Sequence, residues 1–270
     1  MNNNGVKKYI HLFDGQIPDH IDLSPIESYM SDQKFHGIQY GGDWLDMTAL
    51  QGWENKSPDT VDWSEIWEEI DIMNEILDKH QKILPKAERK FWMGNHEGRL
   101  YWFLEKYGPS KKNPYGTDWY RSNKKVIPDL EKELKLKERG FKVYTQYQLG
   151  SYGKLKTYHG GDYSDSNEKK NLQLYGVPIM YGHVHRPGRY TKVSPVSSDP
   201  VSAWSMPCLC NRGPRWKRGS PDSWSNGFGV SYVRSGGFFN LYTVDIVRGQ
   251  FVSPEGKQYG KYQEPISRIH

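Results

Sequence analysis

The chain has 270 residues and a formal net charge of +5, from 37 Lys and Arg against 32 Asp and Glu. Its 10 Trp, 19 Tyr and 9 Phe exclude a disordered chain, and the mild positive charge permits a polyanionic partner without requiring one. No apolar run approaches the roughly 20 residues that span a bilayer, and residues 1–5 lack the charged-then-apolar pattern of a secretory signal, so we expect no membrane partner.

The first part of the chain alternates short apolar runs with helical patterns. Strands are predicted over residues 9–13, 37–41 and 91–93. Apolar residues recur at helical spacing over 61–84, up to Pro85, and again over 97–107. This alternation favours an α/β fold built on a layered sheet.

The later part of the chain favours strands and loops. We expect a loop over 108–127, a charged helix over 129–138, and strands over 143–149, 154–158 and 177–181, the first two paired with each other. The segment 187–228 is rich in Pro, Ser and Gly and is predicted to be irregular, which inside a compact domain usually indicates function. A hairpin over 229–246 closes what we expect to be a single domain spanning residues 1–270.

Five of these predicted strands end in residues that bind metals, each beside a glycine. The five motifs are Asp14-Gly-Gln16, Gly42-Asp-Trp-Leu-Asp46, Gly94-Asn-His-Glu97, His159-Gly-Gly-Asp162 and Gly182-His-Val-His185. Because ligands bind beyond the carboxyl ends of strands in open α/β sheets, the five ends are expected to converge. A pair of divalent cations about 3.5–4 Å apart needs a bridging carboxylate, for which Asp43 is suited. Oxygen and imidazole ligands without thiolate suit Mn, Fe, Zn, Ni or Co.

Taken together and in this order, the motifs resemble those of the calcineurin-like metallophosphoesterase family over residues 14–185. The resemblance implies a four-layer αββα sandwich of two sheets, with a dinuclear metal site at the C-terminal ends of the strands. Residues 224–229 are similar to the C-terminal segments of phage-borne members, which implies a phage or prophage-type protein.

The resemblance also implies a role for each motif residue. Metal 1 would be held by Asp14, Gln16, Asp43 and His185, and metal 2 by Asp43, Asn95, His159 and His183. His96 would act as a general acid or place charge near the transition state, and Asp46 would accept a hydrogen bond from it and orient it. The two divalent ions would be Mn first, with Fe, Zn, Ni, Co or Mg as alternatives.

Two positions leave alternatives open. Gln16 stands where the family usually has histidine, and we weigh its amide as a weaker ligand against His20, four residues on, as a substitute. Arg99 lies one helical turn past His96 and is either solvated or a contact to the phosphate of the substrate. His11, His36, His80 and His270 belong to no motif and are expected to be structural.

The two cysteines of the chain, Cys208 and Cys210, are one residue apart, which excludes a disulfide framework. We therefore expect a reducing, cytoplasmic setting, in a bacterium or a phage-infected host, and buried apolar roles for both side chains rather than metal binding.

The leading function is hydrolysis of a phosphomonoester or phosphodiester by a water molecule that two metal ions activate. A DNA or RNA nuclease is the first alternative, because the net charge is +5 and basic residues surround Trp216 in the segment 212–218. A non-catalytic binding scaffold of the same fold is the second, and Gln16 is the residue that supports it. The substrate and the oligomeric state are left open.

Overall fold

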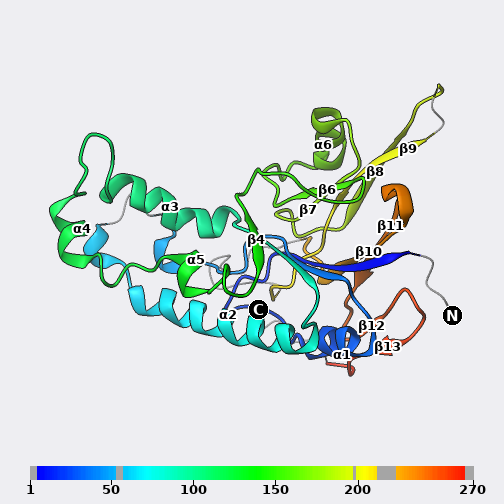
Figure 1. Ribbon diagram of the computed structural model, residues 1–270, viewed down its shortest axis with the longest axis horizontal. Coiled ribbons are helices and arrows are strands. Elements are labelled where there is room, and N and C mark those ends of the chain that lie inside the picture. The colour runs from blue at the N-terminus through cyan, green and yellow to red at the C-terminus, as the bar shows by residue number, and fades with distance from the viewer. Residues whose placement is uncertain (1–4, 53–56, 197–198, 212–222, 265–270) are drawn as a thin grey trace.

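The computed structural model describes residues 5–52, 57–196, 199–211 and 223–264, which form a mixed α/β fold with two main sheets (Figure 1). The first sheet has the order β11 (Phe239–Asp245), β10 (Gly227–Val233), β1 (Lys7–Leu12), β2 (Gly37–Tyr40), β3 (Glu88–Trp92) and β4 (Phe141–Tyr144). Strands β1 to β4 run parallel, whereas β10 is antiparallel to both β1 and β11.

The second sheet has the order β5 (Gly150–Tyr152), β6 (Leu155–Tyr158), β7 (Ile179–Tyr181), β9 (Pro200–Ser205) and β8 (Gly188–Val193). Its central strands β6, β7 and β9 are parallel. A small ribbon pairs β12 (Phe251–Val252) with β13 (Gln258–Tyr259). Both main sheets therefore contain neighbouring parallel strands whose carboxyl ends share an edge.

The helices cover the outer faces of the two sheets. They are α1 (Ser24–Asp32), α2 (Trp63–Ile83), α3 (Asn95–Tyr107), α4 (Asp118–Asn123), α5 (Leu130–Glu133) and α6 (Asn167–Tyr175), with short 3-10 turns at Thr48–Leu50, Pro58–Thr60 and Ser235–Gly237. In Figure 1, α2 runs along the side of the first sheet that faces away from α6. Among the described helices, none combines the length and the apolar character that a membrane span requires.

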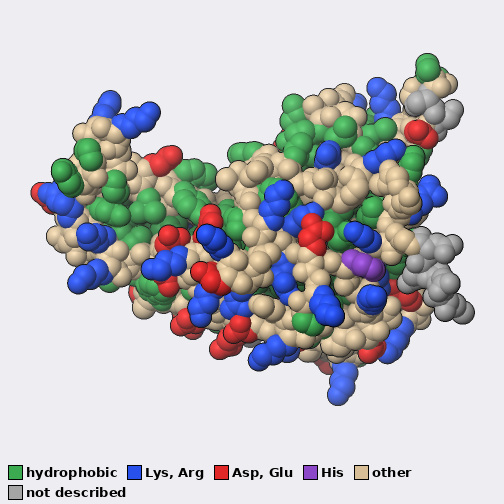
Figure 2. All heavy atoms as spheres, in the orientation of Figure 1, with side chains coloured by type: hydrophobic (Ala, Val, Ile, Leu, Met, Phe, Trp, Pro, Cys, Tyr) green, Lys and Arg blue, Asp and Glu red, His purple; other side chains and the backbone are tan. Residues whose placement is uncertain are grey.

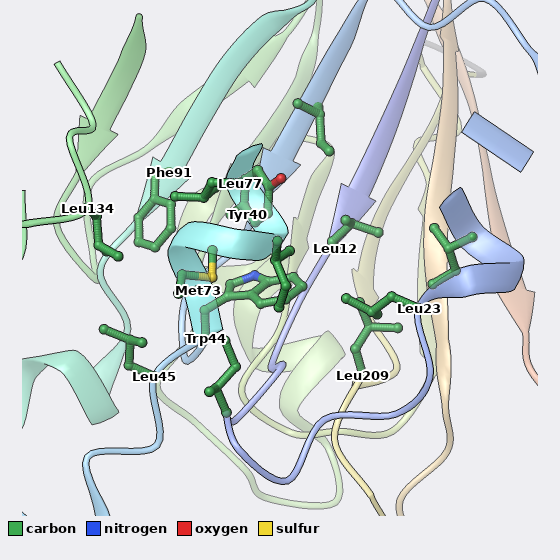
Figure 3. Close-up of a cluster of buried hydrophobic side chains, with 14 of the residues drawn as sticks. Leu12, Leu23, Tyr40, Trp44, Leu45, Met73, Leu77, Phe91, Leu134 and Leu209 are labelled. Atoms are coloured by element: carbon green, nitrogen blue, oxygen red, sulfur yellow. The ribbon is translucent and has the colours of Figure 1, made fainter. Parts of the chain in front are cut away.

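Helix α2 illustrates how the sequence specifies an element. Asp62 caps its start by accepting a hydrogen bond from the N–H of Ser64 at 3.0 Å. Its buried apolar residues lie on one stripe, and each contributes roughly 1.5–3 kcal/mol when taken out of water. In Figure 3, Met73 and Leu77 of this helix lie close to Tyr40, the last residue of β2, and to Trp44 in the loop after it.

Three buried clusters define the layers. The largest lies between the first sheet and helices α1, α2 and α3. A second joins the two sheets face to face through Phe13, Leu155, Met180 and Met206. A third packs Leu172 of α6 against the outer face of the second sheet. The order of layers is thus helix, sheet, sheet, helix.

A buried polar contact also links the two sheets. Gln39 of β2 donates from Nε2 to Oγ1 of Thr157 on β6 at 2.8 Å. Its Oε1 lies 3.0 Å from Nδ1 of His11, whose Nε2 lies 2.7 Å from Oγ of Ser231. Because burial lowers the pKa of His11 to about 3, the ring is neutral, donates to Gln39 and accepts from Ser231.

Several predicted elements differ from the structure. The segment 187–228, predicted to be irregular, contains β8 and β9 in a hairpin; five of the six β8 residues are exposed, so the usual apolar alternation is missing. The predicted loop 108–127 includes α4. The predicted helix 129–138 shrinks to α5, because Lys135, two residues after its end, adopts φ = 50°.

The predicted pairing of 143–149 with 154–158 is wrong. β4 is the edge strand of the first sheet, next to β3, and β6 pairs with β5 and β7 in the second. Helices α1 and α6 were not predicted, since each has only a short apolar stripe.

Candidate metal centre

The motifs that end β1, β2, β3, β6 and β7 meet where the two sheets face each other. Asp14, Asp43 and Asn95 come from the first sheet, and His159 and His183 come from the second. Hydrogen-bond-length contacts connect them across the sheets. The expected convergence of strand ends is what the structure has.

The metal 2 group, which comprises Asp43, Asn95, His159 and His183, is tightly clustered. Oδ2 of Asp43 lies 3.1 Å from Nε2 of His159. Oδ1 of Asn95 lies 3.1 Å from the same nitrogen and 2.7 Å from Nδ1 of His183. Ligands held about 2.1 Å from one octahedral cation lie about 3 Å apart, which these spacings match.

The contacts of His159 leave a position that a cation can fill. Its Nδ1 lies 2.9 Å from the carbonyl oxygen of Gly41, which only accepts, so Nδ1 carries a proton. Nε2 and the oxygens of Asp43 and Asn95 that face it then need a second proton or a cation between them, because their lone pairs would otherwise repel. A backbone carbonyl that fixes the tautomer of the ring is also the usual support of a ligating histidine.

The metal 1 group consists of Asp14, Gln16 and His185 together with the shared Asp43. Nε2 of His185 lies 3.3 Å from Oδ1 of Asp14 and 3.5 Å from Nε2 of Gln16. Both carboxylate oxygens of Asp14 accept from the backbone N–H of His183, at 3.0 and 3.1 Å. Nε2 of Gln16 is the amide atom that faces His185, so Oε1 of Gln16 is left without a hydrogen-bond partner.

Two buried ligand atoms in these groups have no hydrogen-bond partner, namely Oε1 of Gln16 and Nε2 of His183. An unpaired buried acceptor costs about 1–3 kcal/mol, so native structures rarely leave one without a purpose. The donor set is otherwise two carboxylates, one further amide and two imidazoles. Such oxygen and nitrogen donors fit divalent ions of the Mn, Fe and Zn type.

Backbone strain is concentrated at the predicted ligands. Eight described non-glycine residues have positive φ, and five of them are predicted ligands: Asp14, Gln16, Asp43, His183 and His185. Each such residue costs of order 1–3 kcal/mol and persists where the surrounding structure enforces it. This strain marks the five positions as a functional centre independently of any motif.

Glycine beside the ligands is required by space. A Cβ on Gly94 would collide with the carboxylate and the backbone nitrogen of Asp43. A Cβ on Gly42, which has φ = 96°, would lie 2.5 Å from Nδ1 of His159. The glycines therefore let the strand ends approach closely enough for their ligands to meet.

Glu97 is a site residue that the sequence analysis missed. Its carboxylate is fully buried and accepts four backbone N–H groups, from Asp43, Trp44, Leu45 and Gly94, at 2.7–3.0 Å. It thereby fixes the loop that carries Asp43 to the start of α3. The available signal was its place at the third residue of a helix that follows directly on a strand, where an acidic side chain caps backbone N–H groups.

His96 lies beside the ligands and is oriented by Asp46. Its Nδ1 lies 2.7 Å from Oδ1 of Asp46, and its backbone N–H donates to Oδ1 of Asp43 at 2.8 Å. Nε2 lies 3.8 Å from Oδ2 of Asp43 and 3.3 Å from Nη2 of Arg99. Arg99 also donates to the carbonyl of Asp46 at 2.6 Å, so it is half-buried at the centre and not simply solvated.

Neighbouring charges shift the pKa values of the histidines in these two groups in opposite directions. Burial disfavours charge on His159 and His185, but Asp43 raises the pKa of His159 to about 9 and Asp14 raises that of His185 to about 10. Burial and the neighbouring His159 lower the pKa of His183 to about 4. Burial opposes ionisation of Asp43, yet His159 and His96 lower its pKa. The centre therefore favours positive charge beside its aspartates.

Other candidate residues lie elsewhere. His20 lines a surface hollow with Asp22, Glu75 and Lys79, whereas Gln16 contacts His185 of the metal 1 group. His80 is buried against Tyr40, 2.7 Å from its hydroxyl. Cys208 and Cys210 are buried, as expected, but next to His185. His270 and the basic segment 212–218 lie outside the described residues.

No protein-family model matches the chain, and no curated protein does. The fold aligns with Vps29 of Cryptosporidium parvum at 11% identity and a TM-score of 0.44, covering 96% of this chain and 100% of that one. Vps29 of Entamoeba histolytica complexed with zinc aligns at 10% identity and a TM-score of 0.43, covering 90% of this chain and 95% of that one. A dimetal phosphatase from Danio rerio aligns at 11% identity and a TM-score of 0.38, covering 96% of this chain and 98% of that one. At such identities and scores the assignment of ligands rests on the contacts described above.

Proposed function

We propose that the chain is a metal-dependent phosphoesterase that hydrolyses a phosphomonoester or a phosphodiester. The observation that carries this proposal is the convergence at His159, where Nε2 lies 3.1 Å from oxygens of both Asp43 and Asn95 and a cation can replace the proton between them. Beside it, the imidazole of His96 directs its Nε2 toward Oδ2 of Asp43, at 3.8 Å. A cation site next to an oriented imidazole is an arrangement that can catalyse phosphoester hydrolysis, because the metal activates water and the imidazole can protonate the leaving group.

Two divalent ions would occupy the centre, with Mn preferred over Fe, Zn, Ni, Co and Mg. The metal 1 group would hold one ion and the metal 2 group the other, with Asp43 shared. When bound, these ions would supply an activated water and neutralise charge on the phosphoryl oxygens. The amide of Gln16 makes the metal 1 group the weaker of the two, because an amide oxygen binds transition metals less well than an imidazole does.

The chain's own residues would handle the proton and the developing charge. Asp46 holds the Nδ1–H of His96, which leaves Nε2 directed toward the centre. When the ring is protonated, Nε2–H would donate to the leaving oxygen, and Asp46 would stabilise the imidazolium. Arg99, 3.3 Å from the same nitrogen, would add positive charge near the non-bridging oxygens.

The test uses metal-free protein and two nitrophenyl esters, a monoester and a diester, assayed with Mn and the alternative ions. We expect Asp43→Asn and His183→Ala to abolish turnover while the variants keep a native circular dichroism spectrum and two-state melting. Glu105→Gln, on the exposed side of α3, is the matched control and should retain full activity. Ester hydrolysis that is unchanged in Asp43→Asn would contradict the proposal.

The same assay addresses the alternatives. A nuclease would cleave single-stranded DNA faster than either nitrophenyl ester and lose DNA affinity steeply with salt. On the face in Figure 2, Lys and Arg side chains are interspersed with Asp and Glu, which does not favour a basic groove there. A non-catalytic scaffold, the alternative that Gln16 supports, would contain no bound ion and would hydrolyse no ester. The resemblance of residues 224–229 to phage-borne members stays a prediction.

A further inference from the structure

The imidazole of His185 lies between two groups of potential metal ligands. Its Nε2 faces Asp14 of the metal 1 group at 3.3 Å. Its Nδ1 faces the opposite way, toward Sγ of Cys210 at 3.7 Å. One ligand atom each from His185, Cys208 and Cys210 lies within 4.8 Å of the other two, and all three residues are buried.

The two thiols are held on one side of an extended segment. Bridges pair Cys208 with Asn226 and Cys210 with His20, which keeps residues 208–210 extended. Side chains two apart on extended backbone project to the same side. Asn226 reinforces this arrangement, because its Nδ2 donates to the carbonyl of Cys210 at 2.6 Å. The thiols are therefore positioned before any ligand arrives.

The spacing between sulfur and nitrogen fits coordination of a shared ion. With Zn–S near 2.3 Å and Zn–N near 2.0–2.1 Å, a tetrahedral site places the two donor atoms about 3.6 Å apart. The 3.7 Å between Sγ of Cys210 and Nδ1 of His185 agrees with that value. A hydrogen bond from Nδ1–H to the sulfur is the other arrangement that this distance allows.

We propose that Cys208, Cys210 and Nδ1 of His185 bind one thiophilic cation of the Zn²⁺ or Cu⁺ type, apart from the two ions of the proposed hydrolytic centre. Two thiolates and one imidazole select such ions over Mg²⁺ and Mn²⁺. Binding releases the two thiol protons and the proton on Nδ1. His185 is then a ligand on both sides, so occupancy of this thiolate site alters the metal 1 group directly.

The test relies on the chain having only two cysteines, so any thiolate-to-metal charge-transfer absorption must arise from this pair. Metal-free, reduced protein is titrated with Cd²⁺, and the near-ultraviolet band is followed while bound metal is counted by mass spectrometry. We expect the band to saturate at one equivalent per chain and to vanish in Cys208→Ser and Cys210→Ser. Met206→Leu, a buried sulfur side chain in the same segment, should keep it.

A second measurement uses wild-type protein only, so its result does not depend on whether the cysteine variants fold. One equivalent of Zn²⁺ should slow the reaction of both thiols with a maleimide at least tenfold, and Mn²⁺ should have no effect. Absence of a band from wild-type protein that has bound Cd²⁺ would overturn the inference in favour of the hydrogen bond. The readouts do not involve hydrolysis: a protein with the band and no esterase activity would refute only the proposed function, and an active protein without the band would refute only this inference.

Discussion

Replacing Glu97 by glutamine tests whether one buried carboxylate holds the loop of the shared aspartate in place. Oε1 accepts from the N–H groups of Trp44 and Leu45, and Oε2 from those of Asp43 and Gly94. In Glu97→Gln an NH₂ group takes the place of one oxygen and faces two of these donors. Each buried N–H that loses its acceptor costs about 1–3 kcal/mol, so the expected loss of stability is about 2–6 kcal/mol.

The assay is urea unfolding of metal-free protein, followed by circular dichroism, together with Mn²⁺ affinity from calorimetry. Glu105→Gln on the same helix is exposed and should leave the unfolding midpoint unchanged. We also expect Mn²⁺ affinity to fall in Glu97→Gln, because the backbone of Asp43 is no longer held. A variant that unfolds within about 0.5 kcal/mol of wild type, the range of an ordinary surface substitution, would refute the reasoning.

Three further substitutions test the rest of the centre. Gly94→Ala should weaken Mn²⁺ binding, since its Cβ collides with the shared aspartate, whereas Gly98→Ala has room and should be neutral or stabilising; equal affinities by calorimetry would contradict this. Asp46→Asn should lower kcat about 10- to 100-fold at unchanged KM, because the partner of the His96 ring loses its charge; a rise in KM alone would count against the positioning role. Burial raises the pKa of Glu69 from 4.5 to about 9, so the folded chain holds a proton that the unfolded chain loses, and stability falls as pH rises from 4.5 to 9. Glu69→Gln removes the cost of ionising a buried carboxyl group. Its gain in Tm over wild type should therefore be near zero at pH 4.5 and largest at pH 9, and a gain that does not change with pH would contradict this prediction.

The elements that place the centre were largely predictable. Strand β1 and helices α2 and α3 follow from local apolar spacing and their stop signals, within a few residues of the predicted bounds. The ligand motifs were visible because each combines a metal-binding residue with an adjacent glycine. Local patterns are enough for this part, since both the element and the motif are written in consecutive residues.

The contacts that tune the centre were not predictable in the same way. Cys208 and Cys210 reach His185 only because a strand pair brings distant segments together, and no local pattern encodes that approach. The hydrogen bonds that the Glu97 carboxylate accepts from backbone N–H groups likewise depend on a loop about fifty residues earlier in the chain. The hairpin of β8 and β9 was missed because an exposed strand has no apolar alternation to reveal it.

The buried link from Gln39 to Thr157 has a bearing on the centre that lies just beyond the carboxyl ends of the same strands. Asp43 follows the strand that carries Gln39, and His159 follows the strand that carries Thr157. Sliding one sheet across the other would therefore change the separation of two ligands and break this interior contact at the same time. An interior contact that would meet neither a metal nor a substrate thus helps to set the distance between two predicted ligands.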